Sequence, residues 1–238
     1  MKAAVTTTAA LLLAVAHAPA AHAAASTIAP RQEVVALLTG HDVRSRPKLA
    51  RQPTGSVAAR RPITAARTVL PVLGRTVDDH GRGWVRVRLP GRALGGTPPP
   101  RTGWIRASHT RRATRAWHIV VDVGTRRVRV YRRARLVRSY AAVVGQRSTP
   151  TPRGSYFVEE NVRLAADHAG APFALATSAR SSVLQEFAGG PGQIAVHGVE
   201  NIGGRLGTAA SHGCVRLRTA AIAWLAARIS PGSPVTIT

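Results

Sequence analysis

Short runs of alternating apolar and polar residues occur along most of the chain and predict β-strands. The clearest is GWVRVRLPG at 83–91, where every second residue from Val85 to Leu89 is apolar and arginines lie between them. This alternation is typical of a strand with one buried face, and the Pro-Gly pair after it ends the strand. Another Gly-Trp pair, at 103–104, begins a similar segment. Residues 34–108 are therefore expected to form short strands separated by glycine and proline turns.

The second half of the chain contains a denser series of strand patterns. The stretch WHIVVDVGTRRVRVYRRARLVRSYAAVVG at 117–145 holds three strand candidates, and Gly124-Thr125 between the first two fits a hairpin turn. Pro150 and Pro152 favour an extended loop before the next strand. Residues 193–199 predict a further strand that runs into a loop. Adjacent strands joined by tight turns predict an antiparallel sheet.

One segment near the end has helical spacing. In TAAIAWLAARI at 219–229, the large aliphatic residues from Ile222 to Ile229 share one face, and Thr219 is expected to cap the helix. The last residues, PVTIT at 234–238, alternate again and predict a closing strand. The expected fold class is therefore all-β, mainly antiparallel, with a short C-terminal helix.

Residues 1–25 have the features of a cleavable secretory signal. Lys2 precedes an apolar run centred on residues 11–15, and small residues lead to Ala23. The run is shorter than the roughly 20 residues that span a bilayer, and no later segment is long and apolar enough to do so. The sequence predicts an exported protein without a transmembrane segment, either secreted or held at the cell wall.

The two strand-rich regions predict two domains, one at 32–108 and one at 117–238. The segment HTRRATRA at 109–116 carries several charges and no apolar periodicity, so it is expected to be a linker.

The chain is strongly basic, with 34 Lys and Arg against 10 Asp and Glu and a net charge of +24. Removal of the predicted signal takes away Lys2 alone, which leaves 33 basic against 10 acidic residues, or +23. Such a charge attracts anionic partners, among them anionic wall polymers. Aromatic residues are only 4% of the chain and no nucleic-acid-binding motif is present, so nucleic acid is not an expected partner.

Cys214 is the only cysteine, in the stretch GTAASHGCVRL at 207–217. An exported protein usually pairs its thiols, and a lone thiol has no partner in its own chain. A free cysteine is often a small buried hydrophobe, and that interpretation stays open here. The neighbours Ser211, His212 and Gly213 are polar or flexible and favour a reactive turn instead.

A catalytic thiol needs a base and donors that face the developing oxyanion. His197, in QIAVHGVEN, and His212 are both candidate bases, and spacing alone does not choose between them. The amides of Gly213 and Cys214 are candidate oxyanion donors.

Two other interpretations compete with catalysis by the thiol. His197, His212 and Cys214 would make a three-ligand zinc set, but no carboxylates cluster nearby and the spacing is not a standard zinc signature, so neither a metal nor a cofactor is expected. The stretch could also be structural, in a non-catalytic wall-binding protein.

The C-terminal half, about residues 117–238, resembles the L,D-transpeptidases, bacterial wall enzymes with a thiol nucleophile. The resemblance lies in IAVHG at 194–198 and SHGCVRL at 211–217. Supporting matches are TPTPRGSY at 149–156, ALATSARSSVLQEFAGGPGQ at 174–193 and the terminal GSPVTIT. The region 32–108 resembles a bacterial SH3-like module, a small β-barrel often attached to wall enzymes, which would be either a folded spacer or a binder of wall ligands.

The resemblance implies a catalytic β-sandwich or barrel and a role for each motif residue. Cys214 would be the nucleophile, His197 the general base and the main-chain carbonyl of Gly198 the group that orients it. The resemblance gives supporting roles in the turn and the oxyanion site to Ser211, His212 and Gly213, and substrate contact to Arg216.

The implied reaction is acyl transfer between peptidoglycan stem peptides. Cys214 would attack the bond before the terminal D-alanine of a stem tetrapeptide, release D-alanine and pass the acyl group to a neighbouring stem in a 3→3 cross-link. Carbapenems would acylate the same thiol. L,D-carboxypeptidase activity and attachment of a protein to the wall would use the same residues, whereas papain-like wall endopeptidases have their cysteine before their histidine.

Overall fold

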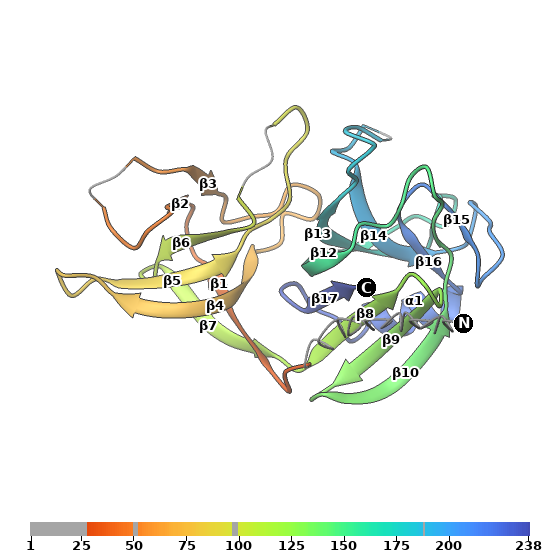
Figure 1. The fold of residues 1–238 in the computed structure, drawn as a ribbon, viewed down its shortest axis with the longest axis horizontal. Coiled ribbons are helices and arrows are strands. Elements are labelled where there is room, and N and C mark those ends of the chain that lie inside the picture. Colours follow the sequence, from red (N-terminus) through yellow and green to blue (C-terminus); the bar gives the residue numbers. More distant parts are fainter. Residues whose placement is uncertain (1–27, 50–51, 97–99, 188) are drawn as a thin grey trace, which may run out of the picture.

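The computed structural model describes residues 28–49, 52–96, 100–187 and 189–238. The predicted signal at 1–25 lies outside the described residues. Within the described residues the chain forms strands and one short helix, which confirms the expected mainly antiparallel β fold (Figure 1). No helix in this part of the chain is long and apolar enough to cross a membrane.

The N-terminal part forms a five-stranded antiparallel sheet in the order β6-β5-β4-β1-β7, beside a small β2-β3 pair. The predicted strand at 83–91 is present as β5, and the second Gly-Trp pair lies in β6. The strands are β1 (Gln32–Leu37), β2 (His41–Val43), β3 (Gly55–Val57), β4 (Val69–Val77), β5 (Gly83–Arg88), β6 (Thr102–Arg106) and β7 (Thr110–Arg115).

The predicted linker at 109–116 is wrong, because residues 110–115 form β7. This strand pairs with β1 along its whole length, from Gln32 opposite Arg115 to Leu37 opposite Thr110. Backbone hydrogen bonds hold an edge strand whatever its side chains are, and the charged side chains of β7 are mostly exposed. Only Ala116 separates β7 from the next strand.

The C-terminal part forms an eight-stranded sheet in the order β10-β9-β8-β17-β12-β13-β14-β16 and a parallel β11-β15 pair. Most neighbours are antiparallel, but β17 pairs with β8 and β14 pairs with β16 in parallel. The strands are β8 (Trp117–Asp122), β9 (Arg127–Arg132), β10 (Arg135–Ala141), β11 (Val144–Gly145), β12 (Gly154–Arg163), β13 (Phe173–Arg180), β14 (Gln193–Gly198), β15 (Ala209–Ser211), β16 (Val215–Leu217) and β17 (Pro234–Ile237).

The helix α1 (Thr219–Ala226) packs its buried side chains Ile222 and Leu225 into the core of the C-terminal part. The predicted cap at Thr219 is wrong. The cap position is Arg218, which makes no side-chain capping bond, and the Thr219 hydroxyl instead donates a hydrogen bond to the Glu200 carboxylate.

The two parts meet through a shared core and a buried ion-pair network. Phe157 of β12 is buried in the N-terminal core, among side chains such as Val35 and Val85. Beside it, the fully buried Glu159 accepts hydrogen bonds from Arg61 at 2.6 Å and from the amide of Gly91 at 2.8 Å, both in the N-terminal part. Because breaking a buried pair costs about 3–5 kcal/mol, these contacts hold the two parts in one arrangement. The SH3-like nature of the N-terminal part stays a prediction.

Candidate active site

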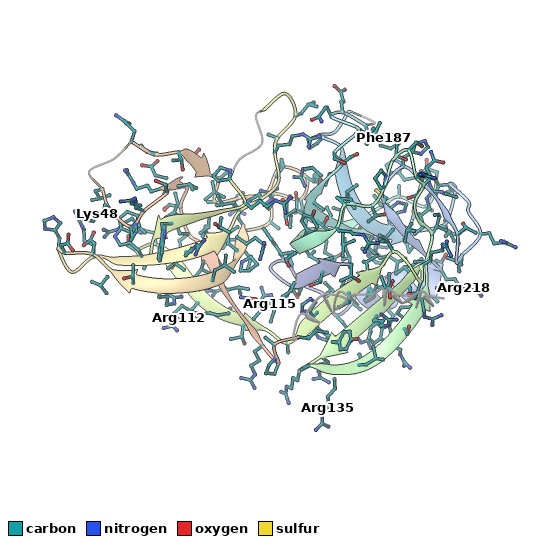
Figure 2. The ribbon with its side chains drawn as sticks, in the orientation of Figure 1. Lys48, Arg112, Arg115, Arg135, Phe187 and Arg218 are labelled. Atoms are coloured by element: carbon teal, nitrogen blue, oxygen red, sulfur yellow. The ribbon has the colours of Figure 1, made fainter. Side chains whose placement is uncertain are left out.

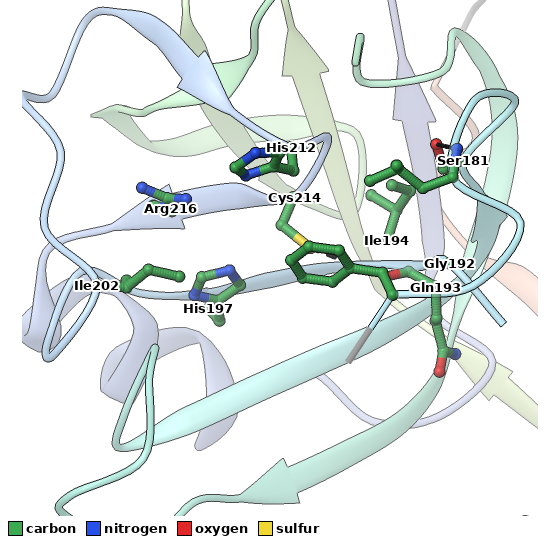
Figure 3. A pocket seen from close by; sticks show the side chains of 11 residues that line it. Ser181, Gly192, Gln193, Ile194, His197, Ile202, His212, Cys214 and Arg216 are labelled. Atoms are coloured by element: carbon green, nitrogen blue, oxygen red, sulfur yellow. Dashed lines mark hydrogen bonds between the residues drawn. The ribbon is translucent and has the colours of Figure 1, made fainter. Parts of the chain in front are cut away.

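A small pocket of about 60 Å³ lies along β14 and beside the start of β16 and contains most of the predicted site residues (Figure 3). Its walls come from β14, from the turn before β16 and from the segment after β13. The lining residues are Ser181, Leu184, Phe187, Gly192, Gln193, Ile194, His197, Ile202, His212, Cys214 and Arg216.

Parallel pairing of β14 with β16 brings the histidine and the thiol together. Val196 lies opposite Val215 and His197 lies opposite Arg216, so residues 19 positions apart in sequence become neighbours in the sheet, and Cys214 directly precedes Val215. Figure 3 shows the ring of His197 and the sulfur of Cys214 facing the same hollow.

The thiol of Cys214 is partly buried and held by the backbone of β14. The amide of Ala195 donates to Sγ at 3.4 Å, and Sγ lies 3.8 Å from the carbonyl oxygen of Gln193. Burial raises the pKa of the thiol above its usual value, and the Ala195 amide and the Arg216 cation partly offset this rise. At neutral pH the resting group is therefore a thiol, which needs a base to become a nucleophile.

His197 is buried and has a defined tautomer. Its Nδ1 lies 2.8 Å from the carbonyl oxygen of Gly198. Because a carbonyl oxygen only accepts hydrogen bonds, Nδ1 carries the proton and Nε2 keeps its lone pair. Burial lowers the pKa of His197, the bond to Gly198 opposes this shift, and the nearby Arg216 lowers the pKa further. The ring is thus neutral at neutral pH and able to accept a proton.

His212 lies in a different setting. It is exposed, and its ring stacks on the ring of Phe187 with 5.7 Å between centroids and 26° between planes. The sequence left His197 and His212 as equal candidates for the base, and the geometry favours His197, which is buried and oriented.

The turn before Cys214 is braced by hydroxyl groups. The buried Ser211 hydroxyl donates to the carbonyl of Cys214 at 2.6 Å and accepts from the amide of Gly213 at 3.1 Å. Thr149 and Thr151 donate to the carbonyls of Ser211 and Gly213, at 3.2 and 2.8 Å. The sequence motif TPTPRGSY contains both threonines, but their bracing role was not predicted.

The backbone conformation at position 213 requires glycine. Its φ is +120°, and a Cβ there would lie 2.9 Å from the side chain of Ile194. Since its amide donates to Ser211 in this structure, the oxyanion role of that amide stays a prediction.

Arg216 is buried on the pocket wall and only partly hydrogen-bonded. Nη1 donates to the carbonyl of Gly203 at 3.2 Å, while Nε has no hydrogen-bond partner among the described residues. Buried donors are normally paired, so a ligand acceptor is the natural partner for this side chain.

The three-ligand zinc arrangement is not found. Within the described ranges, no group of three or more His, Cys, Asp or Glu side chains is placed to hold a metal ion.

Residues 181–187, which we call the rim segment, lie within the supporting match at 174–193, but their place in the pocket wall was not predicted. The rim segment carries Ser181, Leu184 and Phe187 of the pocket wall, and Arg92 of the N-terminal part holds it. Arg92 donates to the carbonyls of Ser181 at 3.2 Å and of Leu184 and Gln185 at 3.1 Å each. The sequence does not reveal these hydrogen bonds, because every residue has a main-chain carbonyl and only folding decides which carbonyls lie near Arg92.

Arg92→Ala is expected to loosen the rim segment. Hydrogen bonds to a charged group contribute about 1.5–3 kcal/mol, so local opening should become about 10–100 times more frequent. Hydrogen exchange of peptides covering 181–187 measures this directly. Arg86→Ala is the matched control, because Arg86 is an exposed arginine of β5 with only a 3.5 Å contact to Thr102. Equal exchange in both variants would contradict a bracing role for Arg92.

The C-terminal part of the chain is similar to known proteins. The family model for the YkuD L,D-transpeptidase catalytic domain matches residues 116–237. YkuD of Bacillus licheniformis, a protein named as an L,D-transpeptidase, is 30% identical over 122 residues, which are 51% of this chain and 66% of that protein.

Solved structures with a similar chain also include proteins named as L,D-transpeptidases. An L,D-transpeptidase from Mycobacterium smegmatis is 18% identical with a TM-score of 0.42, over 83% of this chain and 99% of that one. A variant of the Enterococcus faecium L,D-transpeptidase is 17% identical with a TM-score of 0.40, over 51% and 49%. The chain thus spans about half of the Enterococcus faecium chain and just under two thirds of YkuD.

Proposed function

The chain belongs to the L,D-transpeptidase catalytic-domain family, and on that basis we propose that it is an exported enzyme that cross-links peptidoglycan stem peptides. The observation that carries this proposal is the pairing of β14 with β16, which places a neutral, oriented imidazole and the only thiol in one pocket. The product would be a 3→3 cross-link.

The first half-reaction forms a thioester. Nε2 of His197 takes the proton of the Cys214 thiol while sulfur attacks the carbonyl carbon before the terminal D-alanine of a stem tetrapeptide. The tetrahedral intermediate collapses, the carbon–nitrogen bond breaks, and the proton on His197 passes to the leaving D-alanine amine.

The second half-reaction transfers the acyl group. A side-chain amine of a neighbouring stem attacks the thioester and gives a proton to His197. The carbon–sulfur bond breaks, and the proton returns to Cys214. Water as the acceptor would give carboxypeptidase activity instead, and a protein amine would give attachment to the wall.

The surrounding groups stabilise charge during these steps. The Gly198 carbonyl, which accepts from Nδ1, favours the imidazolium that forms on His197. Arg216 would hold a substrate oxygen through its unpartnered Nε. Amides around Gly213 and Cys214 would face the oxyanion once substrate displaces the bond to Ser211.

Mass spectrometry of muropeptides tests the proposal. The protein without residues 1–25 is incubated with purified stem tetrapeptides, beside Cys214→Ala. We expect a cross-linked species that has lost one D-alanine, absent with the variant. Loss of D-alanine without a cross-link would indicate carboxypeptidase activity instead of cross-linking. Unchanged muropeptides would refute the proposal.

A further inference from the structure

Two larger pockets lie along the boundary between the two parts of the chain, and each shares lining residues with the next. The first, the boundary pocket, shares Ser181 with the Cys214 pocket. The second, the outer pocket, shares Arg88, Ser155 and Tyr156 with the boundary pocket. Each has a volume of about 200 Å³, against about 60 Å³ around Cys214. We call the three adjoining pockets the boundary groove.

The charged side chains that line the boundary groove are all arginines. No aspartate or glutamate lines any of its three pockets. Arg115, which lies near the junction of the two sheets in Figure 2, belongs to the outer pocket. The arginines that line the groove are Arg88, Arg92, Arg101, Arg115, Arg180 and Arg216.

Arg88 and Arg101 distinguish the groove from the many solvated arginines elsewhere on this basic chain. Arg88 is partly buried at the point where the boundary and outer pockets join, and its Nη1 donates to the carbonyl of Ser155 at 2.9 Å. Burial and the nearby Arg101 cation both lower the pKa of Arg88. Among the described residues, no carboxylate lies within ion-pair distance of either arginine. Two cations that repel one another in a partly desolvated pocket favour an anion between them.

The other arginines of the boundary pocket have internal partners. Arg180 pairs with the buried Glu159, and Arg92 donates to carbonyls of the rim segment. Arg88 uses only its Nη1, on the carbonyl of Ser155, so Arg88 and Arg101 keep donors for a ligand, and Arg101 is exposed to solvent.

We propose that the boundary groove binds the free carboxylates of the acceptor stem peptide through Arg88 and Arg101, and so guides its amine to Cys214. This rests on the proposed transpeptidase function. The Cys214 pocket has a volume of about 60 Å³ against about 200 Å³ for each of the other two, so we place the acceptor in the adjoining pockets and the donor at the thiol. A stem peptide is an extended chain at about 3.3 Å per residue, which suits a groove made of successive pockets.

The test separates the acceptor step from acylation. Acylation of Cys214 by a carbapenem needs no acceptor, so Arg101→Gln and Arg88→Gln should acylate at the wild-type rate. Cross-link formation measured against acceptor concentration should show a KM about 10-fold higher with little change in kcat. Arg101→Lys, which keeps the charge, should restore most of the affinity, and Arg86→Gln should behave as wild type.

A modified acceptor gives a second comparison. When the stem carboxylates of the acceptor are amidated, wild type and Arg101→Gln should have the same KM. An unchanged KM for the unmodified acceptor in the arginine variants, with normal acylation, would overturn the groove while leaving the proposed function intact.

Direct binding decides the matter even without turnover. A fluorescent stem tetrapeptide with free carboxylates is titrated onto Cys214→Ala protein, with and without Arg101→Gln, and polarisation is measured. We expect a Kd about 10-fold weaker with Arg101→Gln, and a smaller difference at high salt. Equal affinity would refute the groove. Arg101 is exposed, so this variant should fold even if Arg88→Gln does not, and thermal unfolding checks that.

Discussion

Cys214→Ser is expected to abolish acylation by a carbapenem and to lower cross-linking at least about 1,000-fold. A hydroxyl has nearly the shape of a thiol but ionises far less readily, and His197 alone does not make it an equivalent nucleophile. Intact-mass spectrometry after incubation with excess carbapenem gives the result directly. Wild type should gain the mass of one carbapenem, and the variant none.

The matched control is Ser56→Ala, which changes an exposed serine of β3 outside all three pockets. It should take up the carbapenem as fully as wild type. Because Cys214 is the only thiol, an adduct on Cys214→Ser protein would place the reactive group elsewhere in the chain. An unmodified wild type under the same conditions would argue that the thiol is structural.

His197→Gln is expected to slow acylation by about 100- to 10,000-fold, the usual contribution of a general base. Glutamine keeps a hydrogen-bonding side chain of similar length in the buried site but cannot take the thiol proton. Stopped-flow or quenched-flow measurement of adduct formation gives the rate. His212→Gln is the matched control, because it removes only the exposed ring that stacks on Phe187, and we expect less than about a 10-fold effect.

The pH dependence of acylation has a defined sign. The neutral form of His197 is required, and burial holds its pKa below the usual value of about 6.5. The acylation rate of the wild type should therefore increase with pH around the lowered pKa of His197, below pH 6.5, and should no longer change at pH 7. In His197→Gln this limb disappears, and the remaining rate should rise only where the thiol ionises, above about pH 8.5, since burial raises the pKa of Cys214.

Equal rates in His197→Gln and His212→Gln would refute the assignment of the base. A wild-type rate that still rose between pH 7 and 8 would show that the imidazole is not the group that accepts the proton.

Residue patterns predicted several of the strands by alternation and the short helix by its helical spacing. The pattern around Val85 predicted β5, and the Gly124-Thr125 pair predicted the turn between β8 and β9. Alternation fails for β7, because an edge strand needs only backbone hydrogen bonds and can carry charges on both faces.

The sequence by itself determined the chemistry, and the tertiary structure decided how its parts are arranged. A single thiol with two histidines within 18 positions limits the candidates to a few side chains. Parallel pairing of β14 with β16 and the Gly198 carbonyl then distinguish His197 from His212. The bracing of the rim by Arg92 and the charge of the boundary groove arise from contacts between residues nearly a hundred positions apart. The periodicity of side chains along the sequence cannot predict such contacts, because they depend on how the two sheets pack.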